Sequence, residues 1–96
     1  MIKLTGSEKQ IAWADSIIGD ALKTIELNKT RVSNEYPEGA YKAKELNIWD
    51  TIGTQYNDAL SQLEKMPKNA AIVIDKRDTF GPDGIIYASN QMEKMG

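Results

Sequence analysis

The sequence predicts a mainly α-helical protein, and three observations support this fold class. Apolar residues recur at helical spacing over two long stretches, about residues 7–28 and 38–65. A capping motif precedes the first stretch, and a connector containing proline and glycine separates the two. We therefore expect an antiparallel helical hairpin plus a short C-terminal helix. With 96 residues, the chain suffices for one small domain, residues 1–96.

The first helix is predicted to begin at a capping box. Ser7 is followed three residues later by Gln10, so each side chain can bond the backbone of the other. Trp13 lies beside the apolar stripe of this helix, which predicts that it packs in the core. Gly19 falls in the helix interior, where we expect a neighbouring helix to approach closely. The stripe itself is formed by Ile11, Ala14, Ile18, Ala21 and Ile25.

The second helix is predicted to follow a connector over residues 29–40. Ser33, Asn34, Pro37 and Gly39 are the turn-forming residues of this connector. The helix should end before Pro67, because proline cannot continue a helix. Its apolar residues again step by three and four, which predicts that one face of the helix is buried: Leu46, Trp49, Gly53, Tyr56, Leu60 and Leu63.

The last third of the chain allows two interpretations. The β-branched clusters 72–74 and 85–87 flank a Gly-Pro-Asp-Gly sequence, which favours a β-hairpin over about residues 70–88. The competing interpretation is a short helix that Asn69 would cap. Periodicity cannot separate the two over so short a run, so an α+β fold stays open as the alternative.

Composition restricts the functions that the chain can carry. It has no cysteine and no histidine, which excludes disulfides, thiolate nucleophiles and the most common general base near neutral pH. We therefore expect a protein that is not an enzyme and that needs no cofactor or metal. No apolar run approaches the roughly 20 residues of a membrane span, and the N-terminus lacks an apolar signal-peptide core. A cytoplasmic protein without membrane contact is the expectation.

The stretch "LTGSEKQIAWADSI" resembles the N-terminal signature of a group of small proteins from phages, plasmids and integrative elements of Gram-positive bacteria. In that group Gly-Ser-Glu-Lys-Gln-Ile-x-Trp-Ala opens a helix. Many members also carry an Ala-Lys-x-Trp-Ile-Asp-x-Arg-like segment. The counterpart here is "AAIVIDKRD", where Ile74, Asp75 and Arg77 match and Val73 replaces the aromatic residue. The resemblance implies an origin in a mobile element and a mostly helical fold, and it favours a helix over residues 70–78.

We expect the function to be binding of a host protein or of another protein of the element. An acidic helical protein of a mobile element could inhibit a host defence, such as a CRISPR nuclease, by presenting carboxylates to a basic channel. This hypothesis rests on analogy with small phage inhibitors. Aromatic residues in the connector region and a charged segment near residue 76 supply the candidate partner-binding residues: Tyr36, Tyr41, Asp75, Arg77 and Asp78.

The alternative function is that of an accessory nucleic-acid-binding protein of the element. A helical hairpin would gather basic residues at each of its ends, but glutamates and aspartates interleave both groups. Self-association also stays open, because two amphipathic helices alone make a thin core. One end would hold Lys23, Lys29, Arg31, Lys42 and Lys44, and the other Lys3, Lys9, Lys65, Lys68, Lys76 and Arg77.

Overall fold

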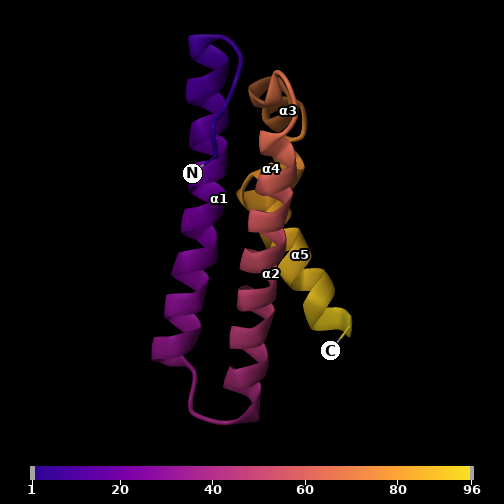
Figure 1. Ribbon diagram of the computed structural model, residues 1–96. Helices are drawn as coiled ribbons and strands as arrows, with labels where there is room; N and C mark the ends of the chain where they lie inside the picture. The colour runs from indigo at the N-terminus through magenta and orange to yellow at the C-terminus, as the bar shows by residue number, and fades with distance from the viewer. Residues whose placement is uncertain (1, 96) are drawn as a thin grey trace.

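A computed structural model describes residues 2–95 and shows helices only within that range, so the β-hairpin alternative is wrong. α1 and α2 form an antiparallel hairpin, joined at one end by a short connector (Figure 1). α3 packs against α1 at the other end, and α5 lies across both long helices. The helices are α1 (Glu8–Glu35), α2 (Ala40–Glu64), α3 (Asn69–Asp75), α4 (Arg77–Phe80) and α5 (Pro82–Met95).

The predicted capping box at the start of α1 is confirmed. The backbone N–H of Gln10 donates to Ser7 Oγ at 3.2 Å, and the N–H of Ser7 donates to Gln10 Oε1 at 3.1 Å. Gly6 precedes the cap with φ at +144°, a conformation that side chains disfavour. A Cβ at Gly6 would also crowd Gln10 Oε1 at 2.8 Å and meet Ala70 at 3.3 Å. The residues before α1 are therefore fitted closely to α3.

α1 continues to Glu35, seven residues beyond the predicted end at residue 28. The turn-forming pair Ser33 and Asn34 does not end the helix, because Val32 extends the apolar stripe and is almost fully buried. Helix formation stops only where Tyr36 adopts an extended backbone ahead of Pro37. The connector is correspondingly shorter than the twelve residues from 29 to 40, since α2 begins at Ala40.

The core between the two long helices follows the predicted stripes closely. In α1, Ile11 is half-buried and the four later members of the stripe are buried. In α2, Trp49 is buried as expected, while Leu46 is half-buried. The buried residues of the two helices are Ala14, Ile17, Ile18, Ala21, Ile25 and Val32 in α1, and Glu45, Ile48, Trp49, Ile52, Tyr56, Leu60 and Leu63 in α2.

Gly19 does not mark a close approach of helices, which corrects the expectation for this residue. A Cβ built at Gly19 would meet no atom within 4 Å. Gly53 does face α1, where a Cβ would lie 3.8 Å from Ile25, an ordinary van der Waals contact. Neither glycine is therefore required by the packing of α1 against α2.

The last third contains three helices, where the sequence predicted one short helix. Gly-Pro-Asp-Gly, which suggested a hairpin turn, includes the start of α5: Pro82 is its first residue and Asp83 lies in its first turn. Proline suits this position, since its missing N–H would have no helical partner there. Ile85 and Ser89 are buried and Met92 is half-buried. This spacing of three and four is helical, and the β-branched residues at 85 and 86 conceal it.

Asn69 does not cap α3, because Lys68 occupies the N-cap position with a left-handed backbone at φ +53°. The Asn69 side chain is instead fully buried. Its Oδ1 accepts from the Thr5 N–H at 2.7 Å, and its Nδ2 donates to the carbonyls of Lys3 and Leu63 at 3.1 and 3.3 Å. One side chain thus ties the N-terminal segment and the end of α2 to α3.

Candidate functional site

Trp13 and Arg77 form the first of two clusters that combine aromatic and charged side chains on the surface. Trp13 is 51% exposed, which corrects the expectation that it packs in the core. The Arg77 guanidinium carbon lies 5.5 Å from the centre of the indole ring, within the range of a cation–π contact. Arg77 Nη1 also donates to the Ile74 carbonyl at 2.8 Å, which fixes the guanidinium on the side toward α3. We call this pair the Trp13–Arg77 cluster.

Carboxylates border the Trp13–Arg77 cluster on one side. A hollow of about 330 Å³ beside Arg77 is lined by Asp20, Asp78 and Asp83, from α1, α4 and α5 respectively. Asp75, at the end of α3, is exposed as well. The lining of this hollow therefore carries three carboxylates and one guanidinium.

Asp75 and Asp78 do not share one continuous helix, although their spacing would place them on one helical face. The chain leaves helical geometry at Lys76, between α3 and α4, where φ is −111° and ψ is 35°. Among residues 2–95, no group of three or more potential metal-binding side chains comes together. The two carboxylates therefore lie on different helices.

The second cluster lies at the connector end of the hairpin. The rings of Tyr36 and Tyr41 are parallel within 3°, with centres 5.5 Å apart. The Arg31 guanidinium carbon lies 6.0 Å from the Tyr36 ring. Tyr36 is half-buried and Tyr41 is 58% exposed. The chain reversal between α1 and α2 brings these three residues together, and we call them the tyrosine cluster.

A buried carboxyl group lies beneath the tyrosine cluster. Glu45 of α2 is only 6% exposed, and its Oε1 accepts from the Tyr41 hydroxyl at 3.3 Å. A shared hydrogen bond with Glu93 of α5, burial and the nearby charge of Glu93 raise the pKa of Glu45 above its ordinary range. Arg31, Glu45 and Glu93 line one pocket of about 320 Å³, so three helices contribute charged groups to the same space.

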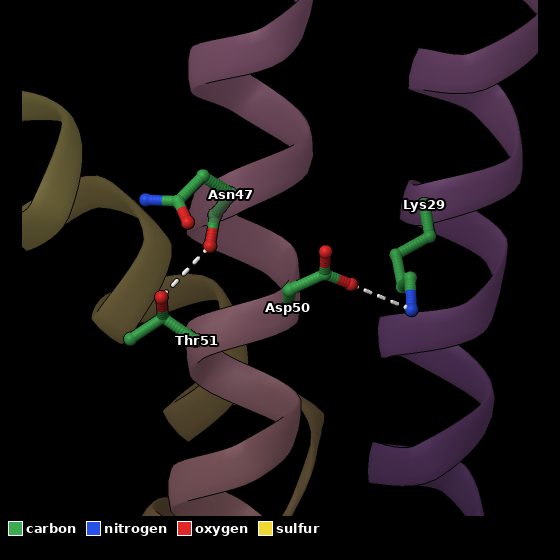
Figure 2. Close-up of polar contacts among 4 residues, drawn as sticks. All are labelled: Lys29, Asn47, Asp50 and Thr51. Carbon is green, nitrogen blue, oxygen red and sulfur yellow. Dashed lines mark hydrogen bonds and ion pairs between the residues drawn. The ribbon is translucent and has the colours of Figure 1, made fainter.

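A third hollow of about 320 Å³ lies between α1 and α2 and contains an ion pair. Lys29 Nζ is 2.8 Å from Asp50 Oδ1, and this hydrogen bond raises the pKa of Lys29. Figure 2 shows Asp50 reaching from α2 toward α1, whereas Asn47 and Thr51 lie on the other side of α2. There the Thr51 hydroxyl donates to the Asn47 backbone carbonyl at 2.8 Å. This pair neutralises one of the lysines that the sequence places at the connector end.

The five candidate residues that the sequence suggests are divided between two places. Tyr36 and Tyr41 belong to the tyrosine cluster near the connector. Asp75, Arg77 and Asp78 lie at α3 and α4, toward the other end of the hairpin (Figure 1). The fold therefore stacks Tyr36 on Tyr41 and places Arg77 and Asp78 at one hollow, but it does not bring these two pairs together.

Sequence reasoning missed Trp13, Glu45 and Glu93 as surface or pocket residues. The burial of Glu45 could have been predicted from its spacing. It lies three residues before Ile48 and four before Trp49, and so falls on the apolar face of α2. Trp13 carried no comparable signal, since its exposure depends on where α3 and α4 pack. Glu93 gave none, because its partner lies 48 positions earlier in the chain.

The N-terminal stretch 4–17 and the stretch 70–78 pack against each other. Thr5, at the start of the first stretch, accepts from the Ala70 N–H through its carbonyl at 3.1 Å. Trp13 of the first stretch meets Arg77 of the second.

Comparison of the chain with protein-family models, with curated proteins and with solved structures found no match. Among residues 2–95, every helix is too short or too polar to cross a bilayer.

Proposed function

We propose that this protein is a non-enzymatic binding protein of a mobile element, and that the Trp13–Arg77 cluster contacts its protein partner. The observation that carries the proposal is the exposed indole ring of Trp13 beside the Arg77 guanidinium. Tryptophan and arginine are among the residues that most often dominate binding energy at protein interfaces. An exposed tryptophan on a helix that has a well-formed apolar face elsewhere is explained by such a role.

The cluster is also held in place before any partner binds. Trp13 lies in the second turn of α1, whose start is fixed by the capping box. Arg77 is held by the indole ring and by the Ile74 carbonyl. Side chains that are already ordered lose less conformational entropy on binding, so more of the contact energy contributes to affinity.

The charges around the cluster support a basic partner surface. Asp20, Asp78 and Asp83 line the adjacent hollow, and Asp75 lies nearby in the chain. Carboxylates attract the lysines and arginines that line nucleic-acid channels. We therefore propose that the partner is a host protein with such a channel, for instance a CRISPR nuclease that this protein inhibits.

We favour a protein partner over nucleic acid because of the same charges. Acidic groups beside Arg77 repel phosphates. At the connector end, Lys29 is paired with Asp50 (Figure 2), and Lys42 Nζ is 2.6 Å from Glu38 Oε1. Two of the five cations that the sequence predicts at this end are thus already neutralised by carboxylates.

Variants of the cluster test the proposal. Tagged parent protein should capture a partner from lysate of a bacterial host, and Trp13→Ala and Arg77→Ala should each weaken capture by roughly tenfold or more. Tyr87→Ala is the matched control, because Tyr87 is an exposed aromatic residue of α5, 66% exposed, and should bind as the parent does. Circular dichroism should show that all variants keep their helical content.

Two outcomes would contradict the proposal. One is capture that is lost equally in Tyr87→Ala and Trp13→Ala, because the effect would then not be specific to the cluster. The other is a gel shift of DNA or RNA that fades steeply as salt rises, which would favour the nucleic-acid alternative. For a captured nuclease, inhibition of DNA cleavage by the parent but not by Trp13→Ala would test the inhibitory role.

A further inference from the structure

The C-terminal half of α5 is attached to the rest of the molecule by few apolar contacts. The buried residues of this helix, Ile85 and Ser89, both lie in its first two-thirds. Beyond them Met92 is half-buried and Met95 is 86% exposed. Figure 1 shows α5 running at an angle to α2. Apolar packing therefore fastens the first part of α5 more firmly than its end.

Hollows flank this part of α5 on two sides. One is the pocket of about 320 Å³ that contains Glu45 and Glu93. The other, of about 240 Å³, is lined by Lys44, Ile48 and Met92 among others. A helix end seated over incompletely filled space loses little packing energy when it moves, so polar contacts decide its position.

Two acidic residues, Glu45 of α2 and Glu93 of α5, line the pocket between these helices. Glu45 is buried under the helix, whereas Glu93 is exposed. Two carboxyl groups can bond each other only when one of them holds a proton, because two carboxylates repel and neither can donate. A bond between Glu45 and Glu93 would therefore require one of them to hold a proton.

We propose that Glu45 and Glu93 form a proton-controlled latch, which holds the C-terminal half of α5 against α2 in mildly acidic solution and releases it as the pH rises. The latch is independent of the Trp13–Arg77 cluster, which lies on other elements.

Neighbouring groups affect the pH at which the latch opens, but they do not take the place of Glu45 and Glu93. On α2, the Tyr41 hydroxyl donates to Glu45, and the charge of Lys44 favours the ionised form. On α1, Arg31 lines the same pocket, but its guanidinium is bonded to Asn28 at 3.0 Å and lies near the Tyr36 ring. The carboxylate charges in turn raise the pKa of Tyr41, so its hydroxyl keeps its proton throughout the range in which the latch operates.

The direction of the pH effect follows from the sign of the shift. Because the folded protein raises the pKa of Glu45, it binds a proton there more tightly than the unfolded chain does. The resulting stabilisation is complete below the ordinary glutamate pKa and is lost as the pH rises through the raised value. The end of α5 should therefore be most firmly attached in the acidic range.

Hydrogen exchange of the intact protein measures the latch directly. After correction for the intrinsic pH dependence of exchange, amides of residues 86–95 should lose protection as the pH rises above the ordinary glutamate pKa of about 4.3. Amides in the first half of α1 should show no comparable loss over this range.

Glutamine variants separate the latch from general charge effects. In Glu45→Gln and in Glu93→Gln an amide can donate to the remaining carboxylate at every pH, so protection of α5 should no longer depend on pH. Glu35→Gln removes the same charge at an exposed position of α1 and should behave as the parent does. If Glu45→Gln fails to fold, the exposed position 93 still provides the test. Protection that is independent of pH in the parent, or that falls equally in Glu93→Gln, would overturn the proposal.

Discussion

At the scale of single residues, Asn69 shows how one polar side chain can organise the end of a helical hairpin. It is fully buried and bonds Thr5, Lys3 and Leu63, which belong to the N-terminal segment and α2. Buried polar groups destabilise a fold unless they are paired, and here the side-chain amide is satisfied on both its oxygen and its nitrogen. Asn69 therefore makes the packing of these segments specific.

We expect Asn69→Ala to lower the free energy of unfolding by about 2–3 kcal/mol, because it leaves a backbone N–H and two carbonyls near the core without their partner. Urea denaturation followed by circular dichroism measures this change. Asn47→Ala is the matched control: Asn47 is exposed and contributes its backbone carbonyl, not its side chain, to the contact in Figure 2. It should change stability by less than about 0.5 kcal/mol. Equal losses in the two variants would contradict the role of Asn69.

At the scale of the elements, the corner between α4 and α5 depends on two glycines, because a side chain at either position would meet the backbone. A Cβ at Gly84 would collide with the backbone carbonyl of Thr79, and one at Gly81 would lie 2.6 Å from the Arg77 carbonyl. Tyr56 of α2 supports this corner, since its hydroxyl donates to the Phe80 carbonyl at 2.5 Å. Tyr56 is buried, and this burial raises the pKa of its hydroxyl. The hydroxyl therefore stays protonated and able to donate. The corner positions α5 over the long helices.

Alanine substitutions at two glycines should have opposite effects. Gly84→Ala should destabilise the protein by about 2 kcal/mol or more, because backbone atoms must shift to admit the methyl group. Gly19→Ala should stabilise it by about 0.5–1 kcal/mol, because the site is open and alanine is the better helix former. Thermal unfolding of the two variants beside the parent measures both. A stabilising Gly84→Ala would show that α5 does not approach α4 as closely as described.

At the scale of the whole molecule, the C-terminal helices change the expectation about self-association. The sequence suggests a thin core of two helices, which would favour association between copies. α3 and α5 instead pack on the hairpin within one chain and add Ala70, Val73 and Ile85 to the core. The molecule measures 47 × 23 × 18 Å, so it is elongated along the hairpin.

We therefore expect a monomer in solution. Light scattering coupled to size exclusion should give the mass of one chain. Small-angle scattering should give a radius of gyration near the 14.6 Å of the Cα atoms, above the roughly 12.5 Å of a compact domain of this length. A mass of two chains at micromolar concentration would show that exposed apolar residues are used between copies.

The sequence by itself determined the helical class, the capped start of α1 and the buried faces of the hairpin. Each of these depends on residues within one or two helical turns of each other, and local spacing records them directly. The end of α1 was misplaced because a buried Val32 outweighs the turn preference of Ser33 and Asn34. In the last third, the β-branched residues pointed to strands, but they lie in α3 and α5, where Val73 and Ile85 pack in the core.

Only the tertiary structure decided the exposure of Trp13, the burial of Asn69 and the meeting of Glu45 with Glu93. Each depends on residues that are far apart in the chain, so no local pattern contains it. The physical reason is that helical spacing specifies which face of a helix is apolar, but not which other helix covers it. In this protein, the covering by α3, α4 and α5 determines which side chains remain on the surface.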